Sequence, residues 1–264
     1  MKAPLTRLAD KTANLGNYYH KYLHIVSSHL DRLTLALERK NVRDRIHLWS
    51  YSPDIDEEMQ TVRMVASDDG EALDFLGCFY ALQFLHMNLR MIDIVKLELP
   101  ISSQRNISSR KLMIEAGMMF RQLTRSYMEQ LLQIFLRDTR HPEFVMLGVG
   151  TRSDQDDIDI GIVHRGPEDP ESLNRAMGRL SSQMFKTATR LHFHLSEHIG
   201  GKSMTAKIEE YEEVLDNNKY DFIIVNEMIG AAAILGSAGL YRDFRERVTQ
   251  RFYYDGEKRM NSFH

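Results

Sequence analysis

The sequence predicts an α+β protein, in which a helical amino-terminal bundle precedes a small mixed sheet with carboxy-terminal helices. Two observations carry this prediction. In the first half, apolar residues recur at spacings of three and four, which is the period of one helix face. After His141-Pro142, two short apolar runs flank an aspartate-rich segment, and both runs have the length and composition of strands. We therefore expect a helical region over residues 1–138 and an α+β domain over residues 139–264.

The helical region is expected to contain three long helices. Residues 15–41 carry apolar side chains along one face and predict an amphipathic helix. The polar stretch 53–69 has the composition of a connection, with room for a short helix. Residues 71–98 are apolar almost all round, which is typical of a helix buried on several sides. Ser108 or Ser109 is expected to cap the third long helix.

The carboxy-terminal part is expected to alternate strands and helices. Residues 144–149 and 158–163 are the two apolar runs, and a helix over residues 170–187 follows them. Apolar and polar residues then alternate over residues 191–197, which predicts a third strand with one polar face. Further helical segments are expected at residues 205–215, 221–236 and 238–251.

Composition excludes several classes of protein. Of the 264 residues, 43% are apolar, which is enough for a substantial hydrophobic core. The formal net charge is only −3, so no general basic field attracts nucleic acid, and a nucleic-acid substrate is unsupported. No segment has the roughly 18 uninterrupted apolar residues of a membrane-spanning helix. We therefore expect a globular protein with no membrane partner.

The single cysteine, Cys78, is surrounded in sequence by Phe75, Leu76, Phe79 and Tyr80. These neighbours predict a buried, inert thiol and argue against a catalytic nucleophile. Because one cysteine cannot form an internal disulfide, a reducing cytoplasmic location is the simplest expectation.

An aspartate-rich stretch between the first two predicted strands is the most informative part of the chain. It reads Thr-Arg-Ser-Asp-Gln-Asp-Asp-Ile-Asp-Ile over residues 151–160. Because successive side chains of a strand point to opposite faces, Asp157 and Asp159 must project from the same side. Two neighbouring carboxylates repel each other, and divalent cations between them reverse this repulsion. The pair is therefore a candidate metal site.

The residues before this pair suit a phosphate group. Gly148 and Gly150 allow the backbone to turn tightly and to approach a ligand closely. The side chains of Thr151, Arg152 and Ser153 offer hydrogen-bond donors to phosphate oxygens. Donors for phosphate thus lie next to ligands for magnesium along the sequence.

Other interpretations of these polar segments fit less well. A solvated hairpin turn is also rich in Asp and Gly, but it would not keep two aspartates in alternation with isoleucines. A calcium loop starting at Asp157 would need an oxygen ligand and a glycine where Gly161 and Ile162 stand. The Gly-Gly-Lys-Ser run that contains Lys202 is similar to the phosphate loop of ATPases, but Ser196 stands where its first glycine is needed.

The aspartate segment resembles the signature of the nucleotidyltransferase superfamily of the DNA polymerase beta type. In that signature a Gly-Gly or Gly-Ser turn follows one strand, and Asp-hydrophobic-Asp-hydrophobic lies on the next. Residues 157–160, Asp-Ile-Asp-Ile, fit the second half, and Gly148-Val149 or Gly150-Thr151 stands in for the first. The segment is most similar to the glutamine synthetase adenylyltransferases and the uridylyltransferases of the nitrogen signalling protein. The resemblance covers roughly residues 140–250.

The resemblance implies a nucleotidyltransferase core that transfers a nucleoside monophosphate from an NTP to a hydroxyl acceptor. Asp157 and Asp159 would bind Mg²⁺ (or Mn²⁺) and act in catalysis. The nucleotide would be contacted by Gly148, Gly150, Thr151, Arg152, Ser153 and Lys202. The acceptor would be a protein side chain, such as a tyrosine, or a small molecule.

Members of this superfamily commonly use a third acidic residue on a neighbouring strand. The predicted strand 191–197 ends at Glu197, and its polar face offers His192 and His194. We expect Glu197 to complete the catalytic set, with His194 as the other candidate for that position. His192 is more simply explained as a residue that faces solvent.

A second function stays open. The loop between the glycines and the aspartates is shorter than in the superfamily, and an imidazole at the third position would favour softer metals than magnesium. Both features favour a catalytically inactive nucleotidyltransferase-fold module that senses nucleotides or acts as a scaffold. In either case the helical region would recognise a partner or report a signal. Its clustered tyrosines and methionines are expected to pack in a core or an interface, which leaves a homo-oligomer open.

Overall fold

The computed structural model describes residues 2–13, 19–98, 105–149, 157–187, 189–197, 203–217, 228 and 230–249. It confirms the α+β class, because long helices precede a small mixed sheet of five strands. The chain divides into two compact units. The helical unit comprises residues 1–134 with 186–188, and the sheet unit comprises residues 135–185 with 189–264. None of the described helices is both long and apolar enough to cross a membrane.

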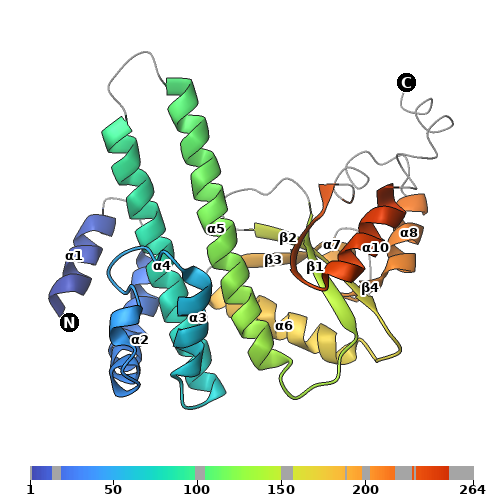
Figure 1. Ribbon diagram of the computed structural model, residues 1–264, viewed down its shortest axis with the longest axis horizontal. Helices are drawn as coiled ribbons and strands as arrows, with labels where there is room; N and C mark the ends of the chain where they lie inside the picture. Colours follow the sequence, from blue (N-terminus) through green and yellow to red (C-terminus); the bar gives the residue numbers. More distant parts are fainter. Residues whose placement is uncertain are drawn as a thin grey trace. The chain divides into compact units, whose positions relative to one another are not determined.

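The helical unit is built from helices of very different length (Figure 1). Its elements are α1 (Lys2–Ala13), α2 (His20–Arg39), the 3₁₀ turn η2 (Arg43–Arg45), α3 (Ile55–Met64), α4 (Asp69–Glu98) and nearly all of α5 (Arg105–Phe135). The predicted helices 15–41 and 71–98 are confirmed over their described residues as α2 and α4, and the short helix in the connection is α3. Helix α1 was not predicted. Helix α5 begins before Ser108 and Ser109, so the prediction that either serine caps it was wrong.

Aromatic stacking holds the core of the helical unit together. Tyr22 of α2 stacks on Phe84 of α4 with ring centroids 4.4 Å apart. Tyr80 of α4 stacks on Tyr127 of α5 at 4.6 Å. Cys78, two residues before Tyr80 on α4, is fully buried, and burial raises the pKa of its thiol. The prediction of a buried thiol at this position is therefore confirmed.

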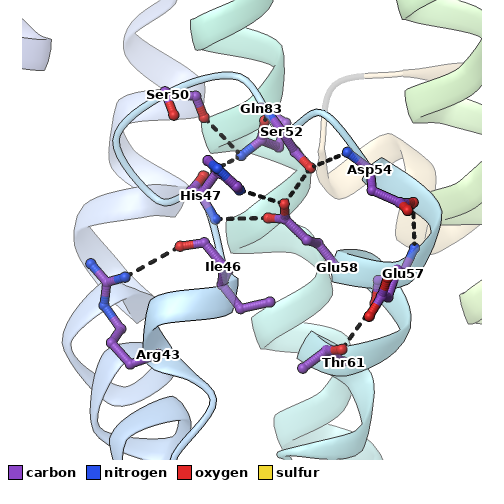
Figure 2. Close-up of polar contacts among 10 residues, drawn as sticks. All are labelled: Arg43, Ile46, His47, Ser50, Ser52, Asp54, Glu57, Glu58, Thr61 and Gln83. Carbon is purple, nitrogen blue, oxygen red and sulfur yellow. Dashed lines mark hydrogen bonds and ion pairs between the residues drawn. The ribbon is translucent and has the colours of Figure 1, made fainter.

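The segment 46–54, which leads into α3, is held in place by a buried carboxylate and a buried amide (Figure 2). Glu58 of α3 is only 4% exposed. Its carboxylate accepts hydrogen bonds from the His47 backbone N–H at 2.7 Å and from the Ser52 hydroxyl at 2.6 Å, and lies 2.6 Å from Nδ1 of His47. Gln83 of α4 donates to the His47 carbonyl at 2.6 Å and accepts from the Ser52 N–H at 2.8 Å. Two helices thus fix both ends of this segment.

Replacing Glu58 with glutamine is expected to lower the free energy of unfolding by about 1–3 kcal/mol. An amide places two N–H donors where the carboxylate has only acceptor oxygens, so a donor of His47 or Ser52 loses its partner. Urea denaturation followed by circular dichroism measures the change. Glu57→Gln, at the exposed neighbouring position, is the matched control and should change stability by less than about 0.5 kcal/mol. Equal effects of the two substitutions would contradict the assigned role of Glu58.

The sheet unit alternates short strands with helices (Figure 1). Its elements are β1 (Glu143–Gly148), β2 (Asp157–Arg165), α6 (Glu171–Lys186), β3 (Arg190–Phe193), α7 (His194–Glu197), β4 (Ala206–Lys207), α8 (Ile208–Asn217), β5 (Ala232–Gly236) and α10 (Ala238–Thr249). The strand order is β3-β2-β1-β5, and β4 pairs with the far end of β2. Strand β1 is antiparallel to β2 and β5, whereas β3 and β4 are parallel to β2.

One hydrophobic cluster of the sheet unit lies on the face covered by α8 and α10. Val145 and Leu147 of β1 and Val163 of β2 are fully buried in one cluster with residues of both helices. Tyr211 of α8 and Phe244 of α10 close this cluster with an edge-to-face ring contact, their centroids 5.7 Å apart. One face of the sheet is therefore dry along most of β1 and β2.

Parts of three predictions in this unit were wrong. The strand expected over 191–197 ends at Phe193, and α7 takes its last four residues. The helix expected over 205–215 begins only at Ile208, because its first residues pair with β2 as β4. The helix expected over 221–236 ends as the strand β5, since residues 232–236 bond to β1; residues 218–227 lie outside the described part. Pairing with an existing strand overrides the helix propensity of alanine there.

Candidate functional site

The two aspartates begin β2, and the register of the sheet decides what lies beside them. Strand β3 runs parallel to β2, with Asp157 opposite Arg190 and Asp159 opposite His192. Because directly paired residues of neighbouring strands share a face, Asp159 and His192 lie side by side. Both of these side chains are partly exposed. A carboxylate and an imidazole therefore meet at this end of the sheet.

Strand β1 reaches the same end of the sheet. Gly148 pairs with Ile160, and the backbone N–H of Val149 donates a 3.0 Å hydrogen bond to the carbonyl of Asp159. The chain thus leaves β1 directly beside Asp159 as it enters the segment that joins β1 to β2. The other residues predicted to contact the nucleotide lie outside the described part of the chain: Gly150, Thr151, Arg152, Ser153 and Lys202.

The apolar core ends next to Asp159. Two residues farther along β2, a β-carbon at Gly161 would lie only 2.9 Å from the Tyr211 hydroxyl oxygen, so α8 packs directly on this glycine. Tyr211 is fully buried, and burial raises the pKa of its hydroxyl. Because residues two apart on a strand share a face, α8 covers this face as far as Gly161. Asp159 is left at the border between the dry core and solvent.

The third residue of the predicted catalytic set is not where the sequence suggested. Because β3 ends at Phe193, His194 begins α7 and is buried, with 4% of its surface exposed. Glu197 is the last residue of α7, and its side chain lies outside the described part. The residue opposite Asp159 is His192, which the sequence suggested would face solvent. No sequence signal identifies it, because the register between parallel strands depends on how the intervening helix packs.

Asp159 and His192 together offer one hard and one softer ligand to a cation. Carboxylate oxygens suit Mg²⁺ and Mn²⁺, whereas imidazole suits zinc and other transition metals. Among the side chains that the structure describes, no group of three or more His, Cys, Asp or Glu residues could hold a metal ion. The Asp157 side chain, the second carboxylate of the predicted pair, is not among those described.

A cavity of about 390 Å³ lies at the opposite end of β2 and is lined by charged residues of both signs. Arg165 pairs there with Asp243 and with Glu143, the latter at 2.9 Å. Arg247 pairs with Glu209 at 2.7 Å. These cations already have carboxylate partners within the unit, so this cavity is poorly suited to an additional anion.

At the start of β2, a carboxylate therefore lies beside the end of β1, the strand that contains Gly148. Comparison of the chain with protein-family models, curated proteins and solved structures found no match.

Proposed function

We propose that the sheet unit transfers a nucleoside monophosphate from an NTP to a hydroxyl acceptor and releases pyrophosphate. The observation that carries the proposal is the position of Asp159. It lies, partly exposed, near the start of β2, with the last residues of β1 on one side and His192 of β3 on the other. The Asp159 carboxylate thus lies beside the end of β1, and the residues that would donate to phosphate follow β1 in the sequence.

The carboxylates of Asp157 and Asp159 would hold Mg²⁺ or Mn²⁺, because hard oxygen ligands suit these ions. Such an ion, when bound, would neutralise charge on the triphosphate and lower the pKa of the acceptor hydroxyl. The protein's own part is to hold Asp159 rigidly. The backbone carbonyl of Asp159 accepts a hydrogen bond from the Val149 N–H. Two residues later, Gly161 packs directly against the Tyr211 side chain. Thr151, Arg152 and Ser153 would donate to the phosphates.

His192 is the residue best placed to assist Asp159. An imidazole beside a carboxylate can orient it by a hydrogen bond, and histidine exchanges protons near neutral pH. We infer that His192 either holds the Asp159 carboxylate in position or accepts the proton of the attacking hydroxyl. The acceptor is a hydroxyl of a protein, such as a tyrosine, or of a small molecule, and the helical unit would recognise it.

The alternative function is that of a nucleotide-binding module without catalysis. His192 favours it, because an imidazole stands opposite Asp159 where a third carboxylate would bind a second ion more tightly. The two functions share nucleotide binding and differ in turnover, so the first experiment concerns binding and the second concerns chemistry.

Nucleotide binding at the aspartate site is expected to add a stabilisation that requires a divalent ion. At a hundred times its dissociation constant, a bound NTP should add about 2.7 kcal/mol to the free energy of unfolding. A thermal-shift screen of the common NTPs with and without Mg²⁺ or Mn²⁺ measures this. The metal-dependent part of the stabilisation should disappear in Asp157→Asn, because a charge that would hold the ion is removed.

The matched control is Asp138→Asn, an exposed aspartate of the same unit that follows α5. This variant should retain the full metal-dependent shift. The proposal fails if no NTP stabilises the wild-type protein with either metal, or if Asp157→Asn and Asp138→Asn behave alike.

A further inference from the structure

The helical unit contains a cavity that is independent of the aspartate site. Its volume is about 560 Å³, within the range of about 300–1,000 Å³ that is usual for small-molecule sites. Helix α1, the segment 46–54 and helix α4 each contribute to its wall. The cavity is lined by Pro4, Arg7, Leu8, Lys11, Trp49, Ser50, Tyr51, His86, Leu89 and Arg90.

The charge of this lining is all of one sign. Arg7 and Lys11 lie one turn apart on α1, so both reach the same face of that helix. Arg90 of α4 adds a third cation, and the lining contains no Asp or Glu. The Glu115 carboxylate lies outside the lining, 3.4 Å from the Arg90 guanidinium, and because Arg90 is exposed and Glu115 partly exposed, this ion pair is weak. Like charges gathered around a cavity repel one another, and a bound anion relieves that repulsion.

Apart from Ser50 and His86, the rest of the lining is aromatic or apolar. Trp49 and Tyr51 lie beside Leu8 and Leu89, which suits the flat ring of a ligand. The Tyr51 hydroxyl is buried and has no hydrogen-bond partner among the described residues. Burial raises the pKa of Tyr51 to about 12, so the hydroxyl keeps its proton near neutral pH. The ring of Tyr51, and not its buried hydroxyl, is therefore the part that a ligand in the cavity could contact.

The wall that carries both aromatic residues is held rigidly. The segment 46–54 is anchored by Glu58 and Gln83, as Figure 2 shows. In addition, Nε2 of His86 lies 3.1 Å from the Leu48 carbonyl oxygen. Burial lowers the pKa of His86, so this imidazole is neutral near pH 7 and adds no charge to the lining. A fixed wall reduces the entropy lost when a ligand binds.

We propose that this cavity binds a nucleotide, with its phosphate against Arg7, Lys11 and Arg90 and its base against Trp49 and Tyr51. Guanidinium and ammonium groups match phosphate oxygens, and aromatic side chains match the face of a base. This site goes beyond the proposed transferase function and does not depend on it. It makes the helical unit a nucleotide-responsive part of the protein.

The chain itself supplies the reporter for the test. Trp49 is the only tryptophan in the sequence, and it lines this cavity. Tryptophan fluorescence of the protein therefore comes from the cavity alone. Titration of the full chain with AMP is expected to change this fluorescence saturably. Adenosine alone and inorganic phosphate alone should each bind about tenfold more weakly or worse, because each fills only half of the site. If inorganic phosphate binds as tightly as AMP, the nucleotide assignment is wrong.

Variants locate the site. Arg7→Gln and Arg90→Gln are both at exposed positions, and each should raise the dissociation constant for AMP about tenfold. Arg39→Gln changes an exposed arginine of α2 outside the lining. It is the matched control and should leave the dissociation constant for AMP unchanged. Asp159→Asn should also leave the Trp49 signal unchanged, which separates this proposal from the aspartate site. Three outcomes would overturn the proposal. They are the absence of a saturable change in Trp49 fluorescence with AMP, binding of AMP by the lining variants as tightly as by the control variant, and loss of the fluorescence change in Asp159→Asn.

Discussion

Asp159→Asn is expected to reduce pyrophosphate release by about a thousandfold or more. Asparagine has nearly the same shape as aspartate, so the backbone bond from Val149 to residue 159 should survive. What is lost is the negative charge that would hold a divalent ion against the triphosphate. A continuous pyrophosphate assay with Mg²⁺ or Mn²⁺, run with a panel of hydroxyl acceptors, measures the rate.

The exposed Asp138→Asn variant is the control for this assay as well, and it should turn over at the wild-type rate. Circular dichroism of Asp159→Asn should match that of the wild-type protein, since asparagine keeps the shape of aspartate at this partly exposed position. Undiminished turnover in Asp159→Asn would rule out the assigned role. Metal-dependent nucleotide binding with no pyrophosphate from the wild-type protein would instead identify the catalytically inactive module.

Gly236→Ala is expected to lower the free energy of unfolding by about 3 kcal/mol or more. The backbone of Gly236 has φ of 104°, a conformation that residues with a side chain rarely adopt. A β-carbon there would lie 2.5 Å from the Phe144 carbonyl oxygen and 2.9 Å from the Val145 Cα. Both obstacles are backbone atoms of β1, so they cannot rotate away.

The damage should extend past the strand itself. The next residue, Ser237, donates its N–H to the Phe144 carbonyl at 2.9 Å, and its hydroxyl accepts from the Leu240 N–H in the first turn of α10. Moving residue 236 therefore disturbs both the end of β5 and the start of α10. Urea denaturation should be followed by circular dichroism, because the only tryptophan lies in the other unit and would not report on this change.

Gly178→Ala provides the matched comparison in the same unit. Gly178 lies inside α6, and a β-carbon there would meet nothing within 4 Å. This substitution should raise stability by about 0.5–1 kcal/mol, because alanine favours a helix over glycine. If the two glycine variants had the same denaturation midpoint, the account of Gly236 would be wrong.

The helices that the sequence predicted well are those with a long, regular apolar pattern. In α2, Val26, Leu30, Leu33 and Leu37 follow the three-and-four spacing, and all are buried. Strands β1 and β2 were also predicted to within two residues, because each is an apolar run bounded by turn-forming residues. In these elements the local pattern and the tertiary structure agree, so the pattern was sufficient.

The elements that the sequence did not predict depend on contacts distant in the chain. Residues 231–233 are three alanines, which favour a helix locally, yet Ala232 and Ala233 pair with Gly148 and Leu147 of β1. The positive φ of Gly236 that ends this strand has no signature beyond the glycine itself. Strand β3 was predicted too long, because the alternation continues through residues that the chain folds into α7.

For the candidate site, the sequence located the aspartates on a strand but not their neighbour. Asp157 and Asp159 lie on β2 as predicted. His192 was not recognised, because its position beside Asp159 follows from the parallel register of β3 and from the point where that strand ends. The basic cavity of the helical unit was also missed, since its lining comes from three separate segments that share no motif.

Because Cys78 is completely buried, the rate at which its thiol reacts with a reagent can measure local opening of the helical unit. A maleimide or disulfide reagent cannot reach this sulfur while α2 and α4 remain packed, and the native chain has no other thiol to consume the reagent. When closing is fast relative to the chemistry, the labelling rate reports the free energy needed to expose that interior. A cysteine introduced at any exposed position would meanwhile react without competition, so a spectroscopic probe could be attached there with the native sulfur left in place.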